Sequence, residues 1–174
     1  MSSPLVLQRP TSIKPNRVAI FIDAANLFYA AGHLGIHIDY RKLKSYLTGR
    51  HCLTNAYFYT GVDSANLQQQ SFLSCLRHIG YQVIAKELVK RADGSVKANL
   101  DVKIALDMTK LANSYDTAIL VSGDGDLEWV VEEVQDQGKR VEVIGLGSMT
   151  SFALRQVSDR YIDLADICSK ICSV

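Results

Sequence analysis

The chain has 174 residues, of which 48% are hydrophobic and 21% charged, with 19 Lys and Arg against 18 Asp and Glu. These values are typical of one globular domain with its own core, and they exclude a disordered chain and a histone-like protein that binds through bulk positive charge. No apolar run reaches the roughly 18 residues of a membrane-spanning helix, and the N-terminal stretch lacks the apolar segment of a secretory signal. We therefore expect a cytoplasmic protein with no membrane partner.

Residues 1–16 contain all three prolines and show no hydrophobic periodicity, so we predict a flexible tail followed by one domain over residues 17–174. Apolar segments that suit buried strands then alternate with segments that suit helices. The predicted strands are 18–23, 53–61, 81–90, 117–122 and 139–145. The predicted helices are 24–31, 40–48, 65–79, 99–113, 126–137 and 149–157, with a short one at the end. This alternation predicts a three-layer α/β/α sandwich with a mostly parallel central sheet.

Polar residues and glycines mark several of the expected element ends. Asp39 and Ser64 are expected to cap the helices that follow them, and Gly80 and Gly138 suit left-handed positions after helices. The four cysteines have no CxxC spacing, and we expect reduced, buried thiols in a reducing compartment. Their positions are Cys52, Cys75, Cys168 and Cys172.

Acidic residues follow two of the predicted strands. The first strand ends in Asp23, with Asn26 three residues later, and the fourth runs into the segment SGDGD at 122–126. In an open α/β sheet the ligand lies beyond the carboxyl ends of the strands, where the strand order reverses. If these two strands are neighbours there, their carboxylates meet at one edge. Asp101, at the start of a predicted helix, is placed to join them.

Converging carboxylates repel each other, and a hard divalent cation relieves that repulsion. Mg²⁺ or Mn²⁺ held by acids in a cleft suits the attack of an activated water on a phosphodiester. No Cys or Ser nucleophile with a His partner competes for this role. A single Asp in such a position is more often a helix cap, and Asp126 suits one. Asp107 fits a supporting acid or a solvated residue equally well, and Asp116 is expected to be structural.

Positive charge and a glycine-containing loop offer contacts for a polyanion. Arg41 and Lys44 belong to one basic group, and Lys97 and Lys103 to another. Each group alone is more typical of a solvated face, although basic residues beside an acidic metal site suit a nucleic acid. The segment from Gly145 to Ser148 is usually a simple connection but can cradle a phosphate.

Three segments carry a family resemblance: FIDAANLF at 21–28, NLDVKIALDM at 99–108 and LVSGDGDLEWVV at 120–131. They resemble the NYN domain, in particular its LabA-like branch, and the similarity spans residues 18–165. The resemblance implies a PIN-like nuclease fold and metal-dependent cleavage of RNA. It also implies a site lined by one set of residues: Asp23, Asn26, Asp101, Asp124 and Asp126, supported by Ser122.

The chain departs from the family pattern at two places. Leu127 stands where the family often has Phe, and a lysine that commonly precedes the acid at position 101 is absent from its usual place. Lys97 is its nearest substitute. Neither departure removes an acid from the expected site.

The first reading is a Mg²⁺- or Mn²⁺-dependent ribonuclease in which Asp23, Asp101, Asp124 and Asp126 bind metal and Asn26 contacts the phosphate or a water. The second is a non-catalytic module that binds RNA or protein through the same cleft. A homodimer or a protein partner is compatible with both. A phosphotransfer domain is disfavoured, because a haloacid-dehalogenase-type phosphatase needs an acid where this chain has Ala25. A receiver domain is also disfavoured, because its phospho-acceptor normally ends the third strand.

Overall fold

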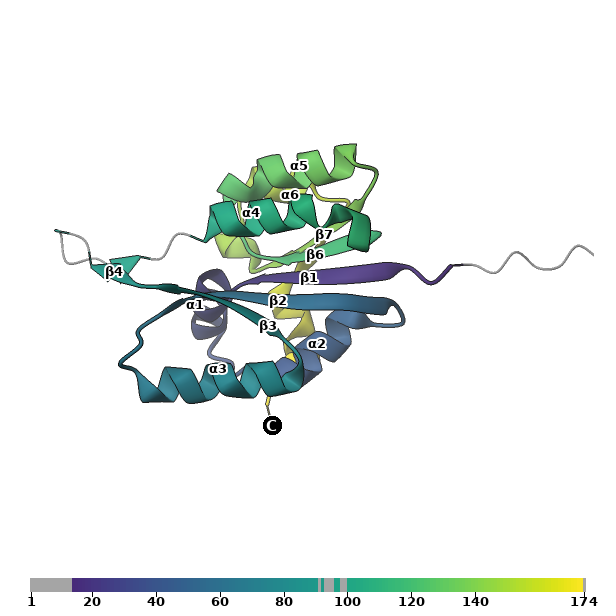
Figure 1. Cartoon of the computed structure of the whole chain (residues 1–174). Helices are drawn as coiled ribbons and strands as arrows, with labels where there is room; N and C mark the ends of the chain where they lie inside the picture. The colour runs from purple at the N-terminus through teal and green to yellow at the C-terminus, as the bar shows by residue number, and fades with distance from the viewer. Residues whose placement is uncertain (1–13, 91, 93–95, 98–99, 174) are drawn as a thin grey trace, which may run out of the picture.

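The central element of this computed structural model is a six-stranded sheet with the order β3-β2-β1-β6-β7-β8, in which all neighbouring strands are parallel. The structure describes residues 14–90, 92, 96–97 and 100–173. The strands of this sheet are β1 (Arg17–Asp23), β2 (Cys52–Val62), β3 (Gln82–Glu87), β6 (Thr117–Val121), β7 (Arg140–Gly145) and β8 (Arg160–Asp163). Figure 1 shows the sheet between two helical layers, which confirms the predicted three-layer α/β/α architecture.

The two faces of the sheet are covered by different helices (Figure 1). One layer consists of α4 (Asp101–Lys110), α5 (Glu128–Asp136) and α6 (Phe152–Val157). The other consists of α1 (Ala24–Leu34), α2 (Tyr40–Thr48), α3 (Leu67–Ile79) and α7 (Leu164–Ile171). Three short 3₁₀ helices, η1 (Ala112–Ser114), η2 (Gly125–Leu127) and η3 (Gly147–Met149), lie in connections.

Strand β1 shows why the sequence forms a doubly covered sheet. Val18, Ile20 and Ile22 pack into the core against α1, α2, α3 and α7, while Ala19 and Phe21 pack into the core against α4, α5 and α6. All five are buried. Each large side chain of this kind contributes about 1.5–3 kcal/mol when it is fully buried. A continuous apolar run therefore fixes β1 at the centre of the sheet.

The third predicted strand, 81–90, is wrong in its second half. The main-sheet strand β3 ends at Glu87, and β4 (Val89–Lys90) pairs in antiparallel fashion with β5 (Val96–Lys97) in a separate two-stranded sheet. The turn expected at 92–95 falls largely outside the described residues. The pairing between β2 and β3 ends at Val62 and Glu87. Beyond Glu87 the chain therefore leaves the central sheet.

Several helix boundaries also differ from the prediction. Asn66, not Ser64, caps α3, because its side-chain oxygen accepts a hydrogen bond of 3.0 Å from the Gln69 backbone N–H. The helix predicted over 99–113 ends at Lys110 and continues into η1, and the one predicted over 149–157 begins at Phe152 after η3. Gly80 and Gly138 do adopt positive φ values of 95° and 77°.

The segment before the first strand is partly tied to the domain. Residues 1–13 of the predicted tail lie outside the described residues. The Asn16 carbonyl oxygen accepts a hydrogen bond from the Cys52 N–H, and its side chain bonds the Thr117 hydroxyl at 3.1 Å. Contacts with the domain therefore begin at Asn16, which belongs to the predicted tail. In the part of the chain that the structure describes, no helix has the length and apolarity needed to cross a bilayer.

The expectation of buried thiols is wrong. All four cysteines are free, but Cys52 and Cys75 are exposed and Cys168 and Cys172 are half-buried. Cys52 opens β2 at the edge of the core, and Cys75 lies on the outer side of α3, so neither fills space inside the protein.

Asp116 has the structural role that the sequence predicts. Its carboxylate binds the Arg17 guanidinium at 2.8 Å and accepts a hydrogen bond from the Arg17 backbone N–H at 2.9 Å. These contacts lower the pKa of the Asp116 carboxyl to about 2.

Because this pKa is depressed by folding, ionised Asp116 stabilises the fold above the ordinary carboxyl pKa, and that contribution is lost as the pH falls towards 2. We expect Asp116→Asn to be less stable than the wild type at pH 7 and nearly equal to it at pH 2. Denaturant unfolding of both proteins across this range measures the difference. A difference that is unchanged at pH 2 would contradict the assignment.

Candidate metal centre

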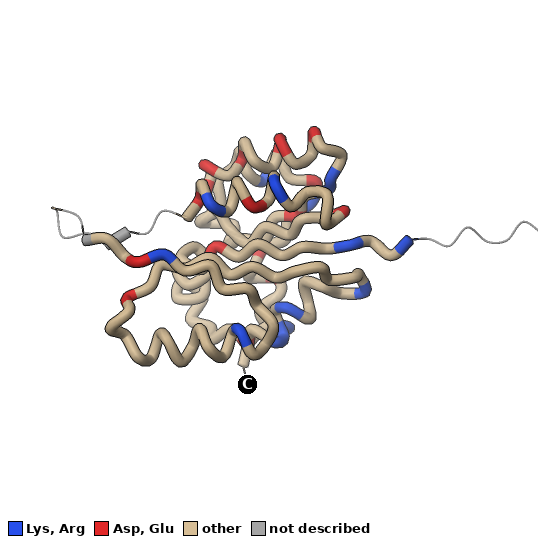
Figure 2. Tube along the Cα trace, viewed as in Figure 1, with Lys and Arg blue, Asp and Glu red and all other residues tan. Residues whose placement is uncertain are grey.

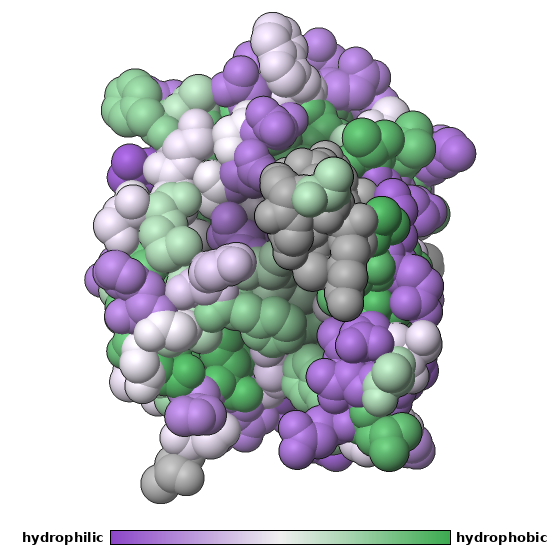
Figure 3. All heavy atoms as spheres, turned by 90° about the vertical axis from the view of Figure 1, so that its left-hand side faces the viewer, coloured by the Kyte–Doolittle hydropathy of each residue, from purple (hydrophilic) through white to green (hydrophobic). Residues whose placement is uncertain are grey.

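The site lies at the carboxyl edge of the sheet, between β1 and β6. These strands are parallel neighbours, with Ile22 opposite Val121, so Asp23 and Ser122 leave the sheet at the same level. From β1 the chain continues to β2 on one side, whereas β6 lies on the other, so the strand order reverses here. Figure 3 looks onto this edge, where hydrophilic side chains are interspersed with apolar ones.

Three carboxylates converge at this edge. One oxygen from each of Asp101, Asp124 and Asp126 lies within 4.8 Å of the other two. Asp101 is the first residue of α4, and the other two come from the turn that leads from β6 into η2. Asp101 and Asp124 are half-buried and Asp126 is exposed, which leaves the cluster open to solvent on one side.

A hydrogen-bond network fixes the turn after β6. The Ser122 hydroxyl donates to Asp23 Oδ2 at 3.0 Å and accepts from the Asp124 N–H at 3.2 Å. Asn26 Oδ1 accepts from the Gly123 N–H at 2.9 Å. Asp124 Oδ1 accepts from the Asp126 N–H at 3.0 Å, so the capping residue after β6 is Asp124 and not Asp126. The first turn of α1 and the β6 turn are therefore held together.

Asp23 adjoins the three-carboxylate cluster but is not one of its members. Its Oδ1 also caps α1 by accepting from the Asn26 N–H at 3.3 Å. Burial raises the pKa of the Asp23 carboxyl above its usual value; the bonds from Asn26 and Ser122 oppose the rise, and the charge of Asp124 adds to it. A nearby cation would relieve this cost of ionisation.

The donor set of the cluster fits a hard divalent cation. All three donors are carboxylate oxygens, the ligand type that Mg²⁺ and Mn²⁺ prefer, and no His or Cys belongs to the group. The open side leaves room for the waters that Mg²⁺ retains. In the described chain this is the one cluster of three or more metal-binding side chains.

The structure places Asp107 away from the cluster. Asp107 is buried on α4, where it accepts a hydrogen bond of 3.0 Å from the Tyr59 hydroxyl and binds Lys103 Nζ at 2.6 Å. Lys103 is thereby occupied by a carboxylate of its own helix. The bond from Tyr59 links α4, whose first residue is Asp101, to β2.

The other predicted RNA contacts are scattered. Arg41 and Lys44 lie on α2, in the layer opposite α4 and α5, and Lys44 Nζ bonds the Ile79 carbonyl oxygen. The side chain of Lys97 lies outside the described residues. Ser148 is exposed.

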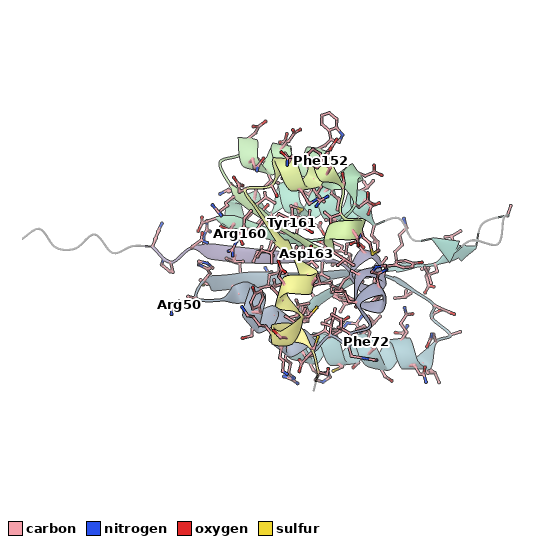
Figure 4. The ribbon with its side chains drawn as sticks, turned by 180° about the vertical axis from the view of Figure 1, so that it is seen from behind. Arg50, Phe72, Phe152, Arg160, Tyr161 and Asp163 are labelled. Carbon is pink, nitrogen blue, oxygen red and sulfur yellow. The ribbon has the colours of Figure 1, made fainter. Side chains whose placement is uncertain are left out.

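The loop that carries Ser148 already holds a carboxylate. Its Gly147 N–H donates to Asp163 Oδ2 at 3.1 Å, so the predicted phosphate cradle is filled by the protein itself. Figure 4 shows Asp163 and Tyr161 on the strand beside this loop, and the Tyr161 hydroxyl bonds the Gly145 carbonyl oxygen at 2.8 Å. Strand β8 is absent from the predicted strands. Its segment YID follows the pattern of FID in β1, apolar residues ending in an acid, and this signal could have revealed it.

Gly145 packs too closely on the β6 turn for any side chain. A Cβ atom there would overlap the Thr150 hydroxyl oxygen and lie 3.1 Å from the Ser122 carbonyl oxygen. We expect Gly145→Ala to lower the free energy of unfolding by about 1–3 kcal/mol, because backbone must shift. Gly32→Ala is the matched control: nothing lies within 4 Å of its Cβ, and Ala favours the helix by about 0.5–1 kcal/mol. Denaturant titrations measure both, and equal effects would contradict the packing argument.

Comparisons with known proteins show the family and the fold of the chain. The family model for the NYN domain matches residues 17–166. The low amplitude and bright protein LabA of Synechococcus elongatus is 38% identical over 168 residues, which cover 92% of this chain and 90% of LabA. The crystal structure of VPA0982, a protein of unknown function from Vibrio parahaemolyticus, has a TM-score of 0.82 at 30% identity and covers 94% of this chain and 99% of that one. The chain therefore belongs to the NYN-domain family, a PIN-like nuclease family, as its sequence motifs predicted.

Proposed function

We propose that this protein is a ribonuclease that hydrolyses RNA phosphodiester bonds with the help of a bound Mg²⁺ or Mn²⁺ ion. The observation that carries the proposal is the convergence of Asp101, Asp124 and Asp126 within 4.8 Å, at the sheet edge where α/β folds bind ligands. Membership of a PIN-like nuclease family supports it. The names of the two relatives state no activity, so the proposal rests on the family and the site.

Asp101, Asp124 and Asp126 would hold the ion. The ion, when bound, supplies a water of lowered pKa and stabilises the charge that develops on the leaving oxygen. Asp124 is pre-positioned, because its N–H donates to the Ser122 hydroxyl and its Oδ1 accepts from the Asp126 N–H. Asp101 is fixed from a second element by the packing of α4.

Asp23 and Asn26 would act on water and phosphate. Asp23 Oδ1 accepts from the Asn26 N–H and Oδ2 from the Ser122 hydroxyl, and a remaining lone pair of the carboxylate can bind the ion or orient the attacking water. Because Asn26 Oδ1 is held by Gly123, the amide Nδ2 is the donor left for a phosphate oxygen, and no bond to Nδ2 occurs among the described residues. Ser122 acts as a positioning residue between Asp23 and Asp124.

The test is cleavage of end-labelled single-stranded RNA by the purified protein in Mn²⁺ or in EDTA. We expect cleavage with Mn²⁺ and none with EDTA. Direct attack by water passes through no cyclic phosphate, whereas metal-independent contaminating ribonucleases that attack through the 2′-hydroxyl first form a 2′,3′-cyclic phosphate. Cleavage that persists in EDTA would contradict the proposal. Binding of RNA without cleavage in either condition would favour the non-catalytic module.

A further inference from the structure

Helix α5 exposes one aromatic and three acidic side chains on the same side. Trp129, Glu132, Glu133 and Asp136 are all exposed, and their spacing of three and four residues places them on one helix face. Trp129 is 72% exposed, and the helix contains no Lys or Arg. We call these four residues the acidic face. Trp is enriched at protein interfaces, where polar and charged residues form the rim around a less polar centre.

The opposite layer carries a surface of complementary charge. Arg41, Lys42, Ser45, Tyr46 and Lys170, from α2 and α7, line a shallow hollow of about 450 Å³. We call these five residues the basic face. Lys170 Nζ lies 5.4 Å from the centre of the Tyr46 ring, so cation and aromatic surface adjoin there.

Two acids accompany this basic face. Asp39 is turned back to cap α2, where its Oδ1 accepts from the N–H groups of Arg41 and Lys42. Asp166 lies one turn before Lys170 on α7 and is exposed. The three cations of the basic face therefore outnumber these two acids, and the surface keeps a net positive charge.

The two faces point in opposite directions. Figure 2 shows acidic positions along α5 at the top of the view and basic positions on α2 at the bottom, with the sheet between them. The net charge of +1 does not reveal this separation, because the opposite charges at the two ends of the molecule nearly cancel. Two copies stacked in the same orientation would bring the acidic face of one against the basic face of the other.

We propose that this protein associates with copies of itself head to tail, with the acidic face of one molecule on the basic face of the next. Trp129 enters the hollow beside Tyr46, with Arg41 and Lys170 flanking the indole. An indole between cations gains cation–π attraction, and Trp is the residue type most enriched at interface hot spots. Because the two faces are different, the contact is heterologous and continues into rings or open chains rather than closing a two-fold dimer.

Sedimentation velocity over a range of concentrations tests the association. The wild type is expected to pass from a species of 19.2 kDa to dimers and larger chains as concentration rises in low salt. Its apparent dissociation constant should rise about tenfold or more in high salt, because the charges are exposed and screened. A wild type that remains monomeric at high concentration in low salt would overturn the proposal. Loss of RNA binding by Arg41→Glu/Lys170→Glu in that monomer would assign the basic face to a polyanion instead.

Charge-reversal variants locate the contact. Glu132→Lys/Asp136→Lys removes the acidic face, Arg41→Glu/Lys170→Glu removes the basic face, and each variant alone should be monomeric. Trp129→Ala, which changes no charge, should weaken association about tenfold or more as a central aromatic anchor does. Glu87→Lys and Lys14→Glu are matched controls on exposed residues outside both faces and should associate like the wild type.

Mixing the two charge-reversal variants distinguishes head-to-tail contact from any symmetric dimer. Each variant retains the face that the other has lost, so the mixture should regain the association that neither variant shows alone, whereas a symmetric contact through one face would persist in the variant that keeps that face. A wild type that associates while the mixture stays monomeric would overturn the proposal, as would variants that associate like the wild type. Thermal unfolding of each variant confirms that it is folded before the comparison.

Discussion

Replacement of Asp124 by Asn should lower metal-dependent cleavage of RNA at least about 100-fold, because even residues that only support metal ligands contribute 10- to 100-fold. Asn keeps the size of the side chain and the Oδ1 that accepts the Asp126 N–H, so the turn after β6 should persist. The variant loses a negative charge from a cluster of like charges, so its stability without metal should hold or rise. Initial cleavage rates and denaturant unfolding measure the two effects.

The controls separate the metal-ligand role from a capping role. If Asp124 only capped η2, Asn would serve nearly as well and cleavage would change little. Asp116→Asn, at the opposite edge of the sheet, should leave cleavage intact while it lowers stability at neutral pH. Wild-type cleavage rates in Asp124→Asn and Asp23→Asn alike would refute the ribonuclease assignment and identify the activity as a contaminant.

Addition of Mn²⁺ should raise the melting temperature of the metal-free protein. At 10 to 100 times the dissociation constant, a ligand that binds only the folded state stabilises it by about 1.4–2.7 kcal/mol. For a domain of this size, this corresponds to a rise of about 3–10 °C. The increase in melting temperature caused by Mn²⁺ should become larger as the pH increases. Because the pKa of Asp23 is raised in the folded protein, ionisation of Asp23 destabilises the metal-free fold as the pH increases through that pKa.

Variants of the cluster provide the matched comparison for this effect. Asp126→Asn should show a smaller shift with Mn²⁺ than the wild type, whereas Asp63→Asn, an exposed acid on another loop, should show the full shift. Melting curves that are identical in EDTA and in millimolar Mn²⁺ would contradict the site.

The fold could be predicted from the sequence where burial dictates the pattern. The runs 18–23 and 117–122 are mostly apolar because both sheet faces are covered, and both form strands of the central sheet within one residue of the predicted ends. Gly80 and Gly138 were identifiable because a left-handed residue after a helix favours glycine.

The incorrect predictions concern elements whose ends are determined by pairing with other parts of the chain. The composition of the segment 81–90 favours one continuous strand. The end of β3 is instead determined by the end of its partner strand β2. Ser64 and Asn66 are both good caps, and the choice between them depends on where the chain leaves β2. The short strand β8 is half-buried and lacks the continuous apolar run of β1.

The candidate site was predictable in outline because carboxyl ends of parallel strands meet at one edge. The sequence did not distinguish the three acids of the cluster from Asp23, since the separation depends on the hydrogen bonds that Ser122 and Asn26 make. It also grouped Arg41 and Lys44 with the site. Only the packing of α2 under the sheet, opposite α4, places those cations on another surface.

The most direct test of the metal centre is anomalous diffraction from crystals of the protein grown with Mn²⁺. We predict one strong peak about 2.1 Å from carboxylate oxygens of Asp101, Asp124 and Asp126, with waters completing the coordination. A crystal with Mn²⁺ bound elsewhere and these three carboxylates without a peak would contradict it.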